Sequence, residues 1–188
     1  MRAPSLVSSL VAAVLTLALA APARAELRIS ELEVFLNDHE VTVHVVLLGA
    51  LPDGVHEAVQ SGIPAHVKFT VELWQYNRYW RDQLVMTKAV ERSLGYNVVT
   101  KEFKVTSLRG ETRPVHATRE LRDAQRILAE LRGLKLTPAA ALDPSAIIYV
   151  RVGAEAALNG ENTFLTRMAG TAEQAARQSD YRTTQRVQ

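Results

Sequence analysis

The feature that most constrains the fold is a run between residues 65 and 74 in which apolar and polar side chains alternate. Every second residue from Val67 to Leu73 is apolar, and the residues between them are polar. Successive side chains of a strand point to opposite faces, so this period of two predicts a half-buried strand with one wet face. The segment Val41–Val45 alternates in the same way, after turn-forming residues at 37 and 38. Two such segments favour an antiparallel sheet, because antiparallel sheets commonly leave one face in water.

Other segments add further strands and two helices. Strands are expected over 27–36, 84–94, 98–106 and 147–152, with a turn at 95–97 and a break in phase after Ile29 that indicates a bulge. A short helix is expected near 54–61, and a longer helix near 119–132, with Thr118 as its N-cap and Gly133 as its C-cap. The sequence therefore predicts a mainly β fold, α+β at the margin, in the form of an antiparallel β-sandwich-like domain with two helices. An open α+β sheet is the alternative.

Residues 1–25 have the pattern of a signal peptide. A basic Arg2 precedes a long apolar run, and Ala23-Arg24-Ala25 places small residues at the cleavage position. We therefore expect a periplasmic protein, or alternatively an extracellular one, that begins near Glu26 and has no transmembrane segment after cleavage. We expect a single β-rich domain over 26–170 and a polar, disordered tail over 171–188.

Charge and cysteine content exclude several classes of protein. The chain carries 22 Lys and Arg against 20 Asp and Glu, and two of the basic residues, Arg2 and Arg24, belong to the predicted leader. The remainder is therefore formally neutral, which disfavours a nucleic-acid partner because binding to phosphates requires concentrated positive charge. The chain has no cysteine, which excludes a thiol nucleophile, a cysteine-ligated metal and a lipoprotein anchor.

A cluster of aromatic and basic residues follows the alternating strand and is the strongest candidate binding surface. Trp, Tyr and Arg are enriched in the energetic centres of protein interfaces. The candidate partner-binding residues are Trp74, Tyr76, Arg78, Tyr79 and Arg81. A competing interpretation places Tyr79 and Trp80 over the open end of the core, with Asp82 bonded to a backbone amide in the turn. We assign Trp80 to that core position and leave Trp74 open between the two interpretations.

Three arginines mark one side of the predicted longer helix. Arg119, Arg122 and Arg126 are spaced by three and four residues, so a helix would align them in one stripe. Such a stripe could meet anionic lipid head groups or an acidic partner. We favour the simpler interpretation, a solvated face whose charge is balanced by neighbours such as Glu120 and Asp123.

The residues needed for metal binding or catalysis form no recognisable motif. The five histidines lack the spacing of a zinc-binding helix, although His44 and His66 could pair across strands. A Gly-x-Ser-x-Gly elbow and a glycine-rich phosphate loop are both absent from the sequence. We therefore expect no catalytic residues, no metal site and no cofactor, and a protein that is not an enzyme.

Several short motifs are familiar together. They are Ile63-Pro64, the alternating strand through Trp74, Arg78–Asp82, Leu94-Gly95-Tyr96, Phe103–Val105 and Tyr149–Val152. With the leader, they resemble a family of exported bacterial proteins classified as a domain of unknown function of the DUF4390 type. The resemblance covers about Leu27 to Gly170 and implies a predominantly β, periplasmic domain. It implies no activity, because none is assigned to the family.

These observations favour a non-catalytic periplasmic binding or adaptor domain that contacts an envelope or membrane protein. The alternative is a carrier or binder of an apolar ligand such as a lipid, held in a cavity between the sheet and the longer helix. A third interpretation, a hydrolase, requires a polar pocket in which a histidine and a carboxylate are in contact.

Overall fold

The computed structural model describes residues 26–36, 39–51, 55–158 and 172–183. The strands are β1 (Arg28–Leu36), β2 (Glu40–Leu48), β3 (Ala65–Gln75), β4 (Gln83–Asn97), β5 (Glu102–Arg109), β6 (His116–Thr118), β7 (Glu130–Pro138), β8 (Ile147–Leu158), β9 (Ala172–Gln178) and β10 (Arg182–Thr183). The helices are α2 (Val55–Gln60) and α3 (Leu121–Ala129), with a short 3-10 turn, η1 (Ala139–Ala141). The prediction of a mainly β fold with a short and a longer helix is confirmed.

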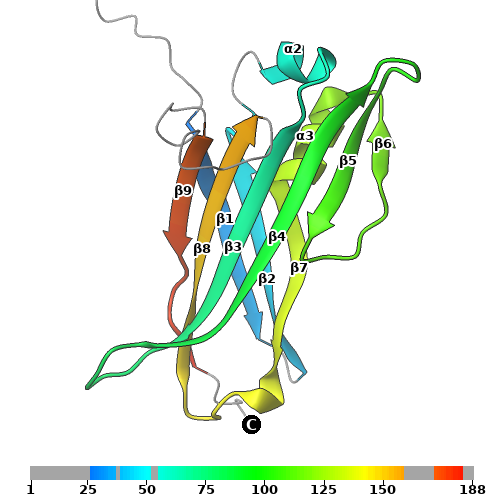
Figure 1. Cartoon of the computed structure of the whole chain (residues 1–188). Helices are drawn as coiled ribbons and strands as arrows, with labels where there is room; N and C mark the ends of the chain where they lie inside the picture. The colour runs from blue at the N-terminus through cyan, green and yellow to red at the C-terminus, as the bar shows by residue number, and fades with distance from the viewer. Residues whose placement is uncertain (1–25, 37–38, 52–54, 159–171, 184–188) are drawn as a thin grey trace, which may run out of the picture.

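The strands form two antiparallel sheets that pack face to face (Figure 1). The smaller sheet has the order β1-β2-β7. The larger one has the order β10-β8-β3-β4-β5-β6, and β9 also pairs with β8. Helix α3 connects β6 of the larger sheet to β7 of the smaller one. This arrangement confirms the sandwich-like architecture and excludes the open sheet.

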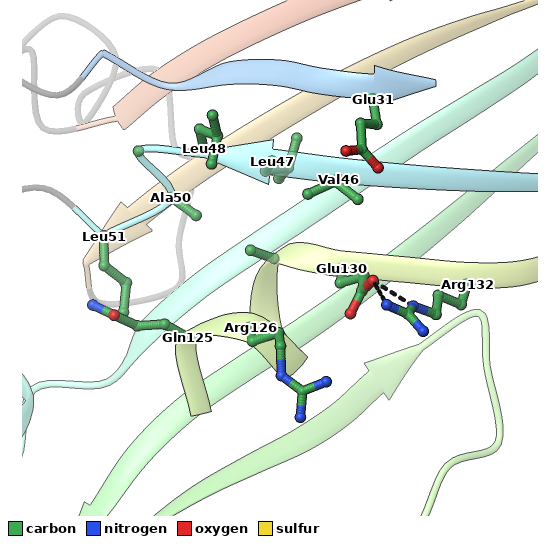
Figure 2. Close-up of a pocket in the computed structure, with 12 residues that line it drawn as sticks. Glu31, Val46, Leu47, Leu48, Ala50, Leu51, Gln125, Arg126, Glu130 and Arg132 are labelled. Atoms are coloured by element: carbon green, nitrogen blue, oxygen red, sulfur yellow. Dashed lines mark hydrogen bonds and ion pairs between the residues drawn. The ribbon is translucent and has the colours of Figure 1, made fainter. Parts of the chain in front are cut away.

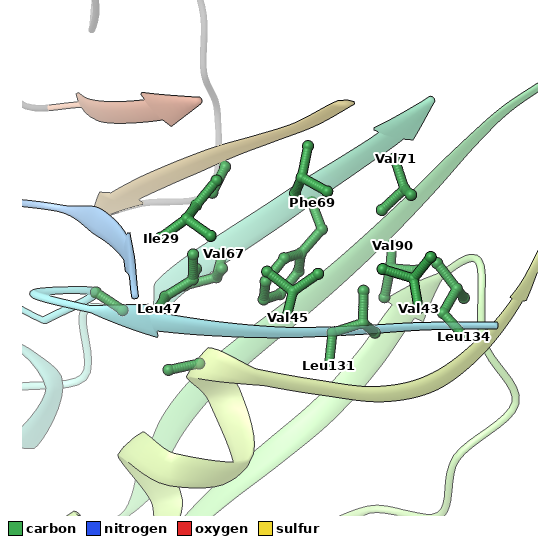
Figure 3. Packing of buried hydrophobic residues seen from close by; sticks show 14 of the residues in the cluster. Ile29, Val43, Val45, Leu47, Val67, Phe69, Val71, Val90, Leu131 and Leu134 are labelled. Atoms are coloured by element: carbon green, nitrogen blue, oxygen red, sulfur yellow. The ribbon is translucent and has the colours of Figure 1, made fainter. Parts of the chain in front are cut away.

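The alternating strand behaves as its pattern predicts. Val67, Phe69 and the other apolar residues of β3 are buried, whereas the polar residues between them are partly exposed on the outer face of the larger sheet. Val43 and Val45 of the smaller sheet lie opposite these buried apolar residues of β3 (Figure 3). The interior of the sandwich is thus built from the inward phases of the two sheets.

Three local features were also predicted, and one of them is displaced. The register of β1 against β2 shifts between Ile29 and Glu31, where the broken phase indicated a bulge. The short helix is α2. The turn expected at 95–97 lies farther along, because Gly95 pairs with Lys104 and Tyr96 packs on Phe103, which extends β4 through Asn97.

The longer helix is shorter than predicted. It ends at Ala129, and residues 130–138 form β7, although the sequence indicated that the helix continues to about residue 132. Leu131 fits both the apolar stripe of a helix and the inward face of a strand. Leu134 and Leu136 have the spacing of two that a strand requires, and a register shift brings Leu131 onto the same buried face next to β2. Pairing with β2 therefore prevails over helix propensity. Gly133, with φ of 63°, allows the chain to turn at a register shift rather than capping a helix.

The tail expected to be disordered contributes two strands. Residues 172–178 pair with β8 as β9, and Arg182–Thr183 pair with Ile147–Ile148 as β10. The polar composition was misleading because β9 lies at a sheet edge, where backbone pairing replaces side-chain burial. Arg177 also links β9 to the smaller sheet, since its Nη1 donates to the carbonyl oxygens of Ile29 and Ser30. The predicted signal peptide, residues 1–25, lies outside the described residues.

One buried arginine joins the two layers and α3. Arg92 of β4 is only 1% exposed, and its Nε and Nη2 donate to the two carboxylate oxygens of Glu111 at 2.5 and 2.9 Å. Its Nη1 donates to the carbonyl oxygens of Ile127 and Glu130, at the C-terminal end of α3, where carbonyls have no helical partner. Burial alone would raise the pKa of Glu111, but the hydrogen bond and charge of Arg92 hold that pKa below its usual value.

Candidate functional site: a projecting aromatic hairpin

Strands β3 and β4 continue beyond the body of the sandwich as a long hairpin (Figure 1). Their pairing runs to Gln75 and Gln83 after a register shift next to Leu73, and residues 76–82 connect them. Four consecutive residues at its end, Arg78-Tyr79-Trp80-Arg81, are all exposed. We call these four residues the tip.

The two aromatic rings of the tip are almost fully in solvent. Tyr79 is 87% exposed and Trp80 is 80% exposed. The prediction that Trp80 covers the end of the core is therefore wrong, as is the same interpretation of Tyr79. The physical reason is that β3 and β4 are long enough to carry their connection past the core. Two adjacent aromatic side chains at this exposure form a contiguous apolar surface of the kind that marks interaction sites.

The base of the hairpin, in contrast, is held by directed hydrogen bonds. Asp82 Oδ1 accepts the backbone N–H of Asn77 at 3.1 Å, as the sequence predicted, and Oδ2 accepts the hydroxyl of Tyr149 at 2.7 Å. The backbone N–H of Tyr76 donates to the carbonyl oxygen of Ile147 at 2.8 Å. Burial and the bond to Asp82 raise the pKa of Tyr149 to about 12, and the bonds from Tyr149 and Asn77 lower the pKa of Asp82.

Trp74 belongs to the support of the hairpin rather than to its tip. Its ring lies parallel to that of Tyr149, at 6.4 Å between centroids, and the Arg151 guanidinium lies 4.9 Å from its centre. Its Nε1 donates to Glu72 Oε2 at 2.8 Å. Tyr181, which follows β9, packs edge-on against Tyr149, with 5.2 Å between the ring centroids. These contacts leave Trp74 half-buried on the outer face of the larger sheet. The contact of Tyr181 with Tyr149 had no local signal in the sequence.

The tip carries positive charge without a balancing carboxylate. The guanidinium of Arg78 lies 5.8 Å from the centre of the Tyr79 ring. Neither Arg78 nor Arg81 forms an ion pair with any residue that the structure describes. The nearest acidic residue in sequence, Asp82, is occupied by Asn77 and Tyr149. The structure therefore brings Tyr76, Arg78, Tyr79 and Arg81 together on one exposed hairpin, as the sequence predicted, and adds Trp80 to them.

The predicted arginine stripe is shorter in the structure. Arg119 precedes α3, which begins at Leu121, so only Arg122 and Arg126 lie on the helix. Arg126 forms an ion pair with Asp123 at 2.7 Å, and the other oxygen of Asp123 contacts His116 Nε2 at 2.8 Å. The histidine and carboxylate that a hydrolase would need are thus in contact, but they join β6 to α3 at the surface.

The histidines that could have paired are separated. His44 lies on β2 in the smaller sheet and His66 on β3 in the larger one, so the suggested cross-strand pair does not form. His44 instead packs against Phe35, with 4.8 Å between ring centroids. Within the described ranges, no group of three or more potential metal ligands is close enough to hold an ion.

A groove lies between the end of β2 and α3, where the sequence placed a ligand cavity (Figure 2). Its volume is about 500 Å³. Apolar residues such as Leu48, Leu51 and Ala129 line it, together with charged residues at its rim. Among the rim residues, Arg132 forms an ion pair with Glu130.

The sequence also carries a family relationship. Residues 24–170 match the model of a family described as a domain of unknown function, DUF4390, and the chain belongs to that family. The resemblance seen in the short motifs is thereby confirmed. No curated protein matches the chain. No solved structure matches it either. Among the described residues, no helix is long and apolar enough to cross a bilayer.

Proposed function

We propose that this protein is a non-catalytic binding module of the bacterial envelope that docks on its partner through the tip of the β3–β4 hairpin. The signal-peptide pattern of residues 1–25 supports a periplasmic location. The partner expected from the sequence is an envelope or membrane protein.

The observation that carries this proposal is the contrast between a fixed base and an exposed tip. Asp82 accepts hydrogen bonds from Asn77 and Tyr149, which restricts the geometry of the turn. Tyr79 and Trp80, presented by that turn, bury little of their surface. A binding surface that is ordered before contact loses less conformational entropy on association, so this arrangement favours recognition.

The test is site-specific photocrosslinking in intact cells with the full chain. A benzophenone amino acid replaces Tyr79 in one strain and Val99 in the control strain. Val99 is 92% exposed at the β4–β5 turn, so the two positions differ in place rather than in accessibility. We expect a discrete adduct from position 79 and none from position 99. Equal labelling from both positions, or no adduct with either a protein or a lipid at position 79, would contradict docking through the tip.

A second candidate function, a binder of an apolar ligand, is favoured by the groove between β2 and α3. Its volume falls in the range of small-molecule sites. Leu48 lines the groove and is exposed, whereas Leu108 is exposed on β5 outside it. Leu48→Arg should abolish binding of a fluorescent fatty acid, and Leu108→Arg should not. Equal binding by both variants would exclude the groove as the site.

A further inference from the structure

The tip has a chemical character that narrows the class of partner. It combines two amphipathic rings, Tyr79 and Trp80, with two cations, Arg78 and Arg81, in four consecutive residues. In membranes, Trp and Tyr concentrate at the interface between hydrocarbon and water. An Arg side chain can extend its guanidinium to the lipid phosphates while its aliphatic stem lies in the apolar layer. This composition suits an anionic lipid surface as well as it suits a protein.

The shape of the hairpin separates these two partners. Energetic centres of protein interfaces are usually surrounded by other contacts that exclude water. The tip is instead the end of a projecting hairpin (Figure 1), and its two rings, Tyr79 and Trp80, are 87% and 80% exposed. A convex end of this kind can enter the head-group layer without a matching cavity.

The residues behind the tip extend the same pattern. Tyr76, Leu84 and Val85 are exposed on the two arms of the hairpin, directly behind the arginines. Deeper insertion would therefore bring further apolar surface into the hydrocarbon boundary. The sole carboxylate of the connection, Asp82, is turned to Tyr149 and Asn77, so an anionic surface meets the two cations first.

We infer that the hairpin tip binds the surface of an anionic phospholipid bilayer, with Tyr79 and Trp80 at the depth of the head groups and Arg78 and Arg81 on lipid phosphates. This inference rests on the proposed docking function and names its partner. The two arginines are free to bind phosphates, because neither is paired with a carboxylate of the described chain.

The experiment is co-sedimentation of the full mature chain with vesicles of phosphatidylcholine alone and with roughly 30% phosphatidylglycerol. Wild type should bind the anionic vesicles and lose that binding at about 0.5 M salt, because salt screens the phosphates. Each arginine near an anionic surface strengthens partitioning about fivefold, so Arg78→Gln/Arg81→Gln should weaken it about 25-fold. Tyr79→Ala/Trp80→Ala should weaken it at least tenfold, roughly the effect of two rings leaving the interface.

Two controls keep the result specific to the tip. Val98→Ser/Val99→Ser alters the exposed apolar residues of the β4–β5 turn and should leave vesicle binding unchanged. Lipids with brominated acyl chains should quench Trp80 emission but not that of Trp74, which packs on Tyr149. Thermal unfolding of each variant shows that the fold is retained.

The outcomes separate this inference from the proposed function. Vesicle binding that the tip variants lose and the control keeps supports the inference. Absence of vesicle binding, or binding that the tip variants keep, overturns it. If a discrete protein adduct then forms at position 79, docking through the tip stands with a protein partner. If neither vesicles nor an adduct is found, both proposals fail.

Discussion

The replacement of Arg92 by methionine tests the internal architecture most directly. Methionine keeps much of the volume of the arginine stem but removes the guanidinium. Four hydrogen bonds are lost with it, two to Glu111 and one each to the carbonyl oxygens of Ile127 and Glu130. The Glu111 side chain is only 18% exposed, so its carboxylate would remain largely out of water without its partner.

The expected cost follows from this loss. Removing one partner of a buried ion pair destabilises a protein by about 3–5 kcal/mol, since it leaves an uncompensated charge. We expect a decrease of about 4 kcal/mol in the free energy of unfolding. At about 3 °C per kcal/mol for a domain of this size, the melting temperature should fall by roughly 12 °C.

The assay is urea unfolding followed by circular dichroism, with Arg126→Met as the matched control. Arg126 pairs with Asp123, but its side chain is 60% exposed and Asp123 keeps its contact with His116, so the loss of Arg126 should cost less than about 1 kcal/mol. Adding Glu111→Gln to Arg92→Met should restore about 1–2 kcal/mol, because the buried charge is then removed. A loss below about 1 kcal/mol for Arg92→Met, or equal losses for the two arginine variants, would refute the reasoning.

Three further predictions concern the hairpin and its surroundings. Tyr149→Phe removes the hydroxyl that Asp82 accepts and should cost about 1–2 kcal/mol in urea unfolding, with faster hydrogen exchange at Asn77 and no change at the β4–β5 turn. The pKa of Tyr149 in the folded protein is about 12, above the usual value of 10.0, so the stabilisation from its hydroxyl is complete below about pH 10 and is lost as the pH rises through about 12. The difference in tyrosinate absorbance between wild type and Tyr149→Phe measures this titration, and a transition near pH 10 would contradict the raised pKa. Gly110→Ala would place a Cβ 1.9 Å from the carbonyl oxygen of Ala89 at φ of 83°, and it should lower the free energy of unfolding by more than about 2 kcal/mol. Gly62→Ala, at φ of 95° with open space around it, should lower it by only about 1 kcal/mol, and equal losses would exclude the steric argument.

Patterns that one strand expresses by itself were readable from the sequence. The alternation through Phe69 and Val71 predicted both the strand and its wet face, because period two has one structural explanation. The broken phase after Ile29 predicted the bulge for the same reason. Where one residue fits two patterns, the sequence was insufficient. Leu131 continues the stripe of α3 and also begins the inward phase of β7, and only pairing with β2 decides between them.

The support of the candidate site depends on contacts between distant segments. Asp82 and its partner Tyr149 are 67 residues apart, and Tyr181 belongs to a tail whose composition suggested disorder. The sequence indicated Arg78 and Tyr79 as part of a candidate binding surface, because Tyr and Arg are enriched in the energetic centres of protein interfaces. It misassigned Trp80 because a large aromatic side chain is most often buried, and no local signal shows that a hairpin overshoots its core.

The structure of the hairpin is difficult to explain by stability alone. The bonds of Asp82 to Asn77 and Tyr149 order the turn, yet ordering a turn costs conformational entropy. A shorter connection would lower that entropic cost, and it would either omit Tyr79 and Trp80 or leave them less exposed to water. The hairpin instead holds both rings in solvent, where they add nothing to the core. Order at the base and exposure at the tip are compatible with each other when the tip becomes buried only on binding, and this is why the tip, rather than the groove beside α3, is the first site to test.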